Sequence, residues 1–277
     1  MFEKGCKIRD FISYSLTIIF FCIFTESLES SINYPFMSFK QFIKELLVRL
    51  DLPVTKNLQY DSYTLKILDK ILKPGSNCVD IGCHKGEILD TILKFSPYGK
   101  HYAFEPIPYL FDFLKEKFKK NNISLYSVAL FDSKGKTSFH HVINAPAYSG
   151  IRRRKYATKD VEIDEMTVET DLLDNIIPET ESIDFIKIDV EGAEYGVLRG
   201  SLKTVKRCRP TIIFEFGLGA ADYYETKPET LFSLITEECE MQVSTLQNFL
   251  KGTQSLKLNH FCELYHTGKE YYFVAHK

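Results

Sequence analysis

From residue 57 onward, short apolar runs alternate with stretches in which apolar side chains recur every three or four residues. The short runs predict buried strands; they cover 77–82, 101–106, 123–130, 183–190 and 210–216. The stretches of helical periodicity predict helices; they cover 63–72, 87–95, 110–119 and 195–200. This alternation is typical of an α/β fold, in which helices cover both faces of a largely parallel sheet.

The alternation is interrupted in the middle of the chain and changes again near its end. Residues 137–142 predict one strand of a local hairpin, and the polar stretch from there to Thr170 predicts an irregular, variable region. Later segments predict a helix at 231–239, a strand at 241–246, a short helix or loop at 259–265 and a strand at 270–275. Two strands so close in sequence predict an antiparallel edge of the sheet.

Residues 1–56 form an N-terminal region in this interpretation, and residues 57–277 form the main domain. Residues 11–25 are uncharged and follow three basic side chains. This run is shorter than the about 20 residues of a membrane-spanning helix, and its length suits the core of a signal peptide. A signal, an anchor and a packed segment all remain open. Residues 38–50 have helical spacing after Ser38 and predict an amphipathic helix.

Charge and cysteine content exclude several classes of function. The 277 residues carry 35 basic and 37 acidic side chains, a formal net charge of -2. This balance lacks the positive surface of a general nucleic-acid binder, so no nucleic-acid partner is expected. The seven cysteines are scattered and contain no Cys-x-x-Cys pair, so no metal site is predicted from them.

A glycine turn follows the first predicted strand of the main domain. Gly82 and Gly86 flank it, and Asp80 stands near the end of the strand. Glycine permits positive φ in a tight turn and a close approach of the backbone to a ligand. His84 breaks the Gly-x-Gly-x-x-Gly pattern of nicotinamide-binding proteins. A plain strand-to-helix turn would not explain the acid at 80, so the turn points to a nucleoside cofactor.

An acid also ends the second predicted strand. Glu105 precedes Pro106 and lies 23 residues after Gly82. In doubly wound sheets a carboxylate at this place can accept hydrogen bonds from both hydroxyls of a cofactor ribose. A surface glutamate before a turn is the alternative, and the agreement with the glycine turn favours ribose binding.

A third group of acids lies where the strand at 183–190 ends. Asp189, Glu191 and Glu194 surround Gly192, at the edge of an α/β sheet where ligands bind. Asp189 could act as a base or orient an acceptor hydroxyl, whereas Glu194 suits the first turn of a helix. Glu215, at the end of the next apolar strand, belongs either to this site or to the solvent-facing side.

The variable region contains two further candidates. Residues 144–161 are the predicted lid over an acceptor. Within them Arg152, Arg153, Arg154 and Lys155 form a basic run that either holds an anionic acceptor or is solvated surface.

Five segments together resemble the FkbM family of S-adenosylmethionine-dependent methyltransferases. They are Val79–Gly86, Phe104–Pro106, Val128–Leu130 with Asp132 and Gly135, Val168–Leu173 and Ile186–Glu194. The resemblance extends from about Asn57 to His276. It implies a class I methyltransferase Rossmann-like fold, with a seven-stranded, mostly parallel sheet, an antiparallel last strand and helices on both faces. It also implies S-adenosyl-L-methionine as the cofactor.

The resemblance assigns roles to individual residues. It places Asp80, Gly82, Cys83, His84 and Gly86 at the methionine part of the cofactor, Glu105 and Pro106 at its ribose, and Ala129 and Leu130 near its adenine. It places Asp189, Glu191 and Glu215 at the methyl group and the acceptor, with Asp189 also beside the cofactor and His84 as a second candidate base. Cys83 and His84 stand where the family more often has Ala and Asn, which alters the hydrogen bonding of the turn.

The predicted function is therefore S-adenosylmethionine-dependent methylation, with a hydroxyl of a sugar, glycan or secondary metabolite as the acceptor. The alternative is a non-catalytic scaffold or sensor that binds the cofactor. Because the cofactor is cytosolic, we expect a cytoplasmic protein, and association with a membrane through residues 11–25 stays open as one use of that segment. Its partner is a small-molecule or glycan acceptor, and its oligomeric state is open.

Overall fold

The computed structural model describes residues 55–156 and 160–277. The hydrophobic segment 11–25 and the predicted amphipathic helix 38–50 lie outside these residues. Packing contacts divide the chain into two units, Met1–Ser62 and Tyr63–Lys277. All features of the candidate site lie in the second unit, and the predicted domain boundary at 56/57 stays a prediction.

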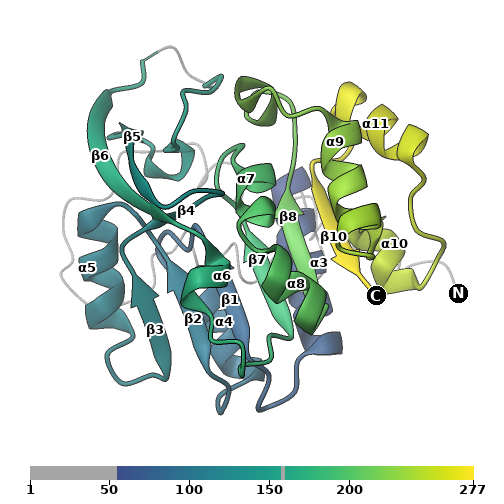
Figure 1. The fold of residues 1–277 in the computed structure, drawn as a ribbon, viewed down its shortest axis with the longest axis horizontal. Coiled ribbons are helices and arrows are strands. Elements are labelled where there is room, and N and C mark those ends of the chain that lie inside the picture. The colour runs from purple at the N-terminus through teal and green to yellow at the C-terminus, as the bar shows by residue number, and fades with distance from the viewer. Residues whose placement is uncertain (1–54, 157–159) are drawn as a thin grey trace, which may run out of the picture. The chain divides into compact units, whose positions relative to one another are not determined.

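A seven-stranded sheet forms the centre of this unit (Figure 1). Its strands are β1 (Cys78–Ile81), β2 (His101–Phe104), β3 (Ile123–Tyr126), β7 (Phe185–Ile188), β8 (Thr211–Glu215), β9 (Gln242–Thr245) and β10 (Tyr272–His276). They lie in the order β3-β2-β1-β7-β8-β10-β9. β10, the last strand in the chain, runs antiparallel to both of its neighbours, and the other neighbouring strands of this sheet pair in parallel. The predicted seven-stranded sheet with an antiparallel last strand is confirmed.

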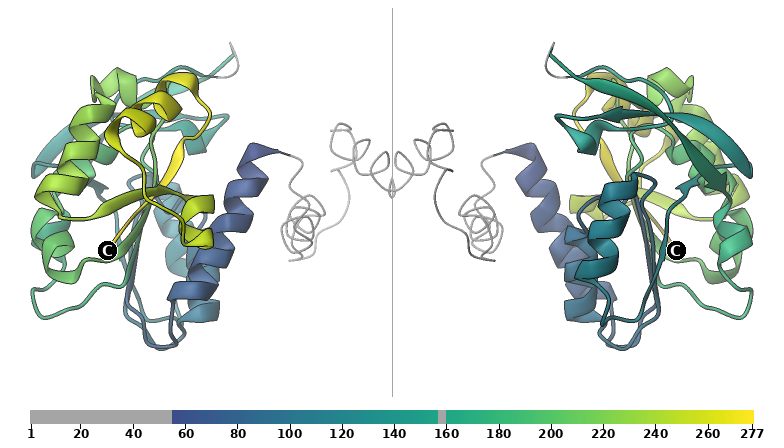
Figure 2. Two further views of the ribbon diagram at one scale, coloured as in Figure 1. Left: turned by 90° about the vertical axis from the view of Figure 1, so that its right-hand side faces the viewer. Right: turned by 90° about the vertical axis from the view of Figure 1, so that its left-hand side faces the viewer.

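Helices lie on both sides of this sheet (Figure 2). They are α3 (Lys56–Ile71), α4 (Glu87–Phe95), α5 (Pro108–Lys117), α6 (Leu173–Ile176), α7 (Glu194–Arg199), α8 (Leu202–Cys208), α9 (Pro228–Ser233), α10 (Leu246–Lys251) and α11 (Leu258–Thr267). α4 illustrates why they form: Leu89 and Ile92 are buried on one face, acids occupy the first turn, and Lys94 lies in the last turn. This charge order favours the helix dipole.

Phenylalanines from four strands occupy the core. Phe104, Phe185, Phe214 and Phe273 come from β2, β7, β8 and β10, and each is at most 1% exposed. Burying such a side chain contributes roughly 1.5–3 kcal/mol. The apolar runs of the sequence therefore mark the strands correctly, because both faces of this sheet are covered.

A second, three-stranded sheet contains the strand predicted at 137–142 and a strand, β6 (Ile163–Asp171), in the stretch predicted to be irregular. β6 lies between β4 (Ala129–Leu130) and β5 (Gly135–Val142), and pairs antiparallel with β5 over eight residues. The predicted strand at 123–130 is correspondingly split between the two sheets as β3 and β4. The sequence pattern does not predict β6, because acids and threonines interrupt its apolar positions. Such a polar segment predicts a loop.

The C-terminal part also differs in detail from the prediction. The segment 259–265, left open between helix and loop, is the helix α11, and the strands β9 and β10 are confirmed. The predicted helix at 231–239 is divided between α9 and a π-helical segment, Leu234–Glu238. α10 was not predicted, because its six residues are too few to show a helical period.

The turn between β1 and α4 brings the first strand close to the end of β7. Gly82 has a φ of 77°, and a Cβ atom there would overlap the backbone carbonyl oxygen of Asp189. Gly86 has a φ of 72° and precedes α4, where a Cβ would press on the ring of Phe118. The glycines predicted from the sequence are thus required both by φ and by close approach.

The prediction of a cytoplasmic protein associated with a membrane through residues 11–25 is not supported and is corrected here. In residues 55–156 and 160–277, no helix is long and apolar enough to cross a bilayer. The longest helix of this part, α3, has 16 residues, whereas a span needs about 20 apolar ones.

Gly82→Ala tests the turn. We expect it to lower the free energy of unfolding by more than about 2 kcal/mol, because the left-handed conformation alone costs an L-residue about 1–2 kcal/mol and the new methyl group overlaps Asp189. Gly75→Ala is the control, since nothing lies within 4 Å of a Cβ at that position. Urea unfolding followed by circular dichroism measures both. Equal midpoints for the two variants would contradict the turn geometry.

Candidate active site

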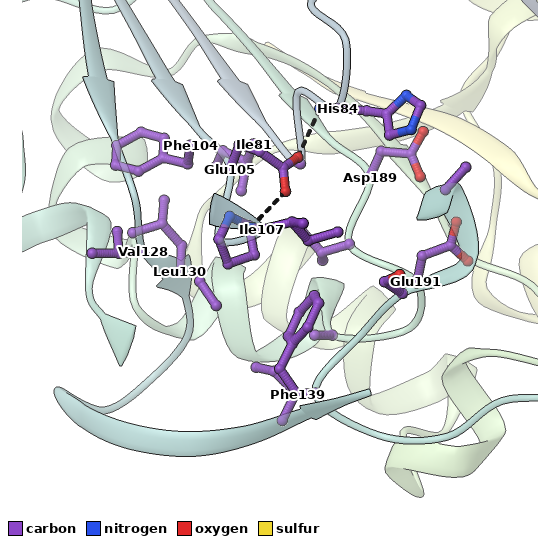
Figure 3. A pocket seen from close by; sticks show the side chains of 18 of the residues that line it. Ile81, His84, Phe104, Glu105, Ile107, Val128, Leu130, Phe139, Asp189 and Glu191 are labelled. Carbon is purple, nitrogen blue, oxygen red and sulfur yellow. Dashed lines mark hydrogen bonds between the residues drawn. The ribbon is translucent and has the colours of Figure 1, made fainter. Parts of the chain in front are cut away.

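A pocket lies at the carboxyl ends of β1, β2 and β7 (Figure 3). The space inside it, with the solvent at its open mouth included, is about 570 Å³. The first sheet contributes the turn after β1, the residues after β2 and the acidic bend after β7. The second sheet and the segment Pro146–Ile151 close the opposite side.

The Glu105 carboxylate lies inside this pocket, 5% exposed. One oxygen accepts a hydrogen bond from the backbone N–H of His84 and the other from that of Ile107, both at 2.9 Å (Figure 3). Burial raises the pKa of Glu105 to about 7, although these two hydrogen bonds oppose the shift. Each oxygen can accept a further hydrogen bond, so two converging acceptor positions remain for a ligand.

Apolar side chains line the part of the pocket next to Glu105. Ile107, Ala129, Leu130 and Phe139 contribute to it, and all four are at least 92% buried. They come from the end of β2 and from β4 and β5. A wall of this kind suits a flat, apolar group of a ligand.

Three carboxyl groups gather at the end of β7 and β8. Oxygens of Asp189, Glu191 and Glu215 lie within 4.8 Å of one another, a spacing that a cation could bridge. Two side chains already supply positive charge there: Arg154 pairs with Glu191, and Lys187 Nζ lies 2.7 Å from Asp189 Oδ2. Cationic side chains of the protein therefore pair with two of the three carboxyl groups, Asp189 and Glu191.

Asp189 and Glu215 differ in their expected protonation. Burial raises the pKa of Asp189, but the Lys187 charge and hydrogen bonds from Glu215, Lys187 and Tyr272 outweigh it and hold that pKa below its ordinary value. Burial and the negative charge of Asp189 raise the pKa of Glu215 well above its ordinary value. The two shifts have opposite directions, which favours Glu215 over Asp189 as the carrier of a proton that the pair shares.

Glu194 shapes the acidic bend. Its side chain is 1% exposed, and one oxygen accepts hydrogen bonds from the backbone N–H groups of Val190 and Gly192, at 3.2 and 3.1 Å. Burial raises the pKa of Glu194 to about 7. It holds the bend in place, which agrees with the structural interpretation of this acid at the start of α7.

The structure brings most of the predicted site residues to one pocket. Gly82, His84, Glu105, Pro106, Ala129, Leu130, Asp189 and Glu191 line it. Asp80 and Cys83 are buried and are absent from its described lining, Gly86 precedes α4, and Glu215 adjoins Asp189. The roles assigned to these residues stay predictions.

The predicted lid contributes a wall and one inward-facing cation. Arg154 lies with its guanidinium carbon 5.2 Å from the centre of the Tyr148 ring and pairs with Glu191. Arg152 instead holds two neighbouring tyrosines: its backbone N–H donates to the Tyr224 hydroxyl at 2.9 Å and its guanidinium to the Tyr223 carbonyl at 3.0 Å. The basic run therefore fastens this segment to the rest of the domain.

Sequence reasoning missed several contributors. Lys187 stands in a motif that was recognised, and its position two residues before Asp189 signals that both lie on the same face of β7. Ile107 and Phe139 look like ordinary core residues. Nothing near Tyr272 in the sequence signals its contact with Asp189, because 83 positions separate the two residues.

Two solved structures match this chain at low sequence identity. Methyltransferase FkbM from Methylobacillus flagellatus is 13% identical with a TM-score of 0.43, covering 74% of this chain and 54% of that one. A fibrillarin from Aeropyrum pernix, in complex with natively bound S-adenosyl-L-methionine, is 10% identical with a TM-score of 0.41, covering 77% and 73%. This chain spans about half the length of the Methylobacillus protein. Neither similarity bears on the substrate.

Two sequence comparisons are closer. The 2-O-methyltransferase NoeI of Sinorhizobium fredii is 28% identical over 186 residues, which are 62% of this chain and 75% of that protein. The model of the methyltransferase FkbM domain matches residues 80–243, more than half of the 277 residues. The match includes the glycine turn, Glu105, the acidic bend and Glu215. The chain belongs to the FkbM family of S-adenosylmethionine-dependent methyltransferases.

Proposed function

We propose that this protein transfers a methyl group from S-adenosyl-L-methionine to a hydroxyl oxygen, with the acceptor beside Asp189. The observation that carries the proposal is the pairing of two carboxylates in one pocket. Glu105 has two converging acceptor positions, and Asp189, which the structure favours in its ionised form, lies at the other end of the same lining. A protein that only binds the cofactor would need the first carboxylate and has no use for the second.

The residues of the pocket fit the cofactor. Glu105 suits the two hydroxyls of its ribose, and the apolar wall of Ile107, Ala129, Leu130 and Phe139 suits adenine. The turn at Gly82 and His84 would hold the methionine part, and the Asp80 carboxyl, 2% exposed, lies behind that turn. Among the described residues, Asp80 Oδ2 and His84 Nε2 are buried without a hydrogen-bond partner. When bound, the cofactor supplies a methyl group on a positively charged sulfur.

In this proposal Asp189 is the base that removes the proton of the acceptor hydroxyl. An ionised carboxylate orients the acceptor hydroxyl and takes its proton as charge develops on the oxygen, an effect worth about 10²–10⁴-fold in rate. His84, whose ring lies beside Asp189 in Figure 3, is the second candidate. Burial lowers the pKa of His84, so its imidazole is neutral and able to accept a proton. Glu191, paired with Arg154, borders the acceptor side.

An oxygen acceptor is supported by the relative named a 2-O-methyltransferase. The proposed acceptor is a hydroxyl of a sugar, glycan or secondary metabolite. The non-catalytic alternative keeps the cofactor pocket and predicts no methyl transfer, so the two proposals differ in a measurable outcome.

Glu105→Gln tests the ribose contact. We expect the Kd for S-adenosylhomocysteine to rise about 10–100-fold, because hydrogen bonds to a charged group contribute roughly 1.5–3 kcal/mol. Isothermal titration calorimetry measures the loss. Glu116→Gln is the matched control, since Glu116 is exposed on α5. This variant should bind S-adenosylhomocysteine with the affinity of the parent. Unchanged binding by Glu105→Gln would remove Glu105 from the cofactor site.

The affinity for S-adenosylhomocysteine should also depend on pH. Glu105, with a pKa of about 7, must be ionised to accept two hydroxyl donors, and ligand binding favours that form. The affinity is therefore full above pH 7 and falls as the pH drops through 7, by up to about tenfold per unit. Calorimetry between pH 5.5 and 8.5 measures this slope. Glu105→Gln should flatten it, and an equal slope in that variant would assign the titration to another group.

Asp189→Asn separates binding from chemistry. We expect binding of S-adenosylhomocysteine to stay within about threefold of the parent, while methyl transfer falls about 10²–10⁴-fold. The assay follows a labelled methyl group from S-adenosylmethionine into a panel of oligosaccharides and small alcohols. Asp112→Asn, exposed on α5, is the control. Full transfer by Asp189→Asn would exclude Asp189 as the base, and binding without transfer by the parent to any acceptor would favour the non-catalytic alternative.

A further inference from the structure

The polar residues next to Asp189 form a row across four strands of the sheet. Asp80 of β1 pairs in register with Lys187 of β7, and Glu215 of β8 pairs with Tyr272 of β10. Ile188 pairs with Phe214, so the next residues, Asp189 and Glu215, are neighbours at the strand ends. Since side chains alternate between faces along a strand, all five residues of this row lie on one face.

Two side chains of the row donate to the same carboxylate oxygen. Lys187 Nζ lies 2.7 Å from Asp189 Oδ2, and the Tyr272 hydroxyl lies 2.6 Å from it. The same hydroxyl lies 3.3 Å from Glu215 Oε2. Lys187 is 5% exposed and its Nζ is 4.9 Å from the centre of the Tyr272 ring. Lys187 and Tyr272 thus contact each other as well as Asp189.

The charges in the row do not balance if every acid is ionised. Asp80, Asp189 and Glu215 are three carboxyl groups, and Lys187 is the cation among them. Glu194 from α7 adds another buried acid, and His84 from the turn after β1 also faces Asp189. Because ionising several carboxyl groups in one buried cluster is unfavourable, the pKa values of Glu194 and Glu215 are raised. Burial raises the pKa of Asp80 to about 7, and Asp189 is the member that the donors keep ionised.

We propose that Tyr272 and Lys187 are positioning residues, which hold the Asp189 carboxylate in place beside Glu215 through hydrogen bonds to its Oδ2. This inference rests on the proposed function. The acceptor oxygen forms its bond to the methyl carbon, the bond from that carbon to sulfur breaks with its electrons on sulfur, and the hydroxyl proton passes to Asp189. An oxygen that gains a methyl group becomes strongly acidic, so a carboxylate of low basicity suffices if it is ionised and aimed.

The role assigned to Tyr272 differs from simple packing. Phenylalanine would fill the same space and keep the ring beside Lys187. Only the hydroxyl donates to Asp189, so removing it should change the protonation of Asp189 and leave the fold and the cofactor pocket intact. Tyr272 is absent from the described pocket lining. The cofactor affinity of a Tyr272 variant therefore reports whether the pocket is intact, independently of the titration of Asp189.

The test is a carbon-13 NMR titration of the full chain labelled at the side-chain carboxyls of Asp and Glu. Asp189→Asn and Glu215→Gln assign the two signals. In the parent, Asp189 should titrate below the ordinary range of aspartate and Glu215 above that of glutamate. Tyr272→Phe should raise the midpoint of Asp189 by about one to two pH units, the effect of losing a hydrogen bond to a charged group. Its affinity for S-adenosylhomocysteine should stay within about twofold.

Tyr271→Phe is the matched control, because it removes a hydroxyl one position away and should leave the Asp189 titration unchanged. An unmoved Asp189 midpoint in folded Tyr272→Phe would overturn the proposal. So would a protonated Asp189 at pH 7 in the parent, which decides the question even if the variant fails to fold. If the parent does not bind S-adenosylhomocysteine, the proposed function is contradicted instead. Failure of the positioning proposal and failure of the proposed function are therefore distinguishable.

Discussion

Burial of carboxyl groups at the carboxyl edge of the sheet is the constraint on which the rest of the site depends. A buried carboxylate must be matched by hydrogen-bond donors or a cation, or else it takes up a proton. The structure shows the first two solutions: backbone N–H groups for Glu105, and Lys187 and Tyr272 for Asp189. The raised pKa of Glu215 corresponds to the third. The turn after β1 delivers the N–H of His84, and the segment after β2 delivers that of Ile107.

The sequence predicts well those parts of the fold and site that local patterns determine. α4 begins and ends where its apolar period places it, and the glycines at 82 and 86 adopt the positive φ that the turn requires. Glu105 was found because its position at the end of a strand, after a glycine turn, has a chemical meaning of its own. In these places the residues that make the structure are close together in the chain.

The misses have the opposite cause. β6 was taken for a loop because its charged outer face obscures a strand whose partner, β5, lies about 30 positions earlier. Tyr272 and Arg154 reach the acidic cluster through contacts with residues 83 and 37 positions away. No local pattern signals such contacts. They depend on the register between strands and on how the second sheet packs over the pocket, which only the folded chain defines.

The place of β10 connects the acid cluster to the far edge of the sheet. In the described part of the sheet β9 pairs with β10 alone, and β10 lies between β8 and β9. β9 is thus attached to the sheet through β10, which also carries Tyr272 and its contact with Asp189. A change that displaces β10 would therefore detach the edge strand and remove a hydrogen-bond donor from Asp189 at the same time.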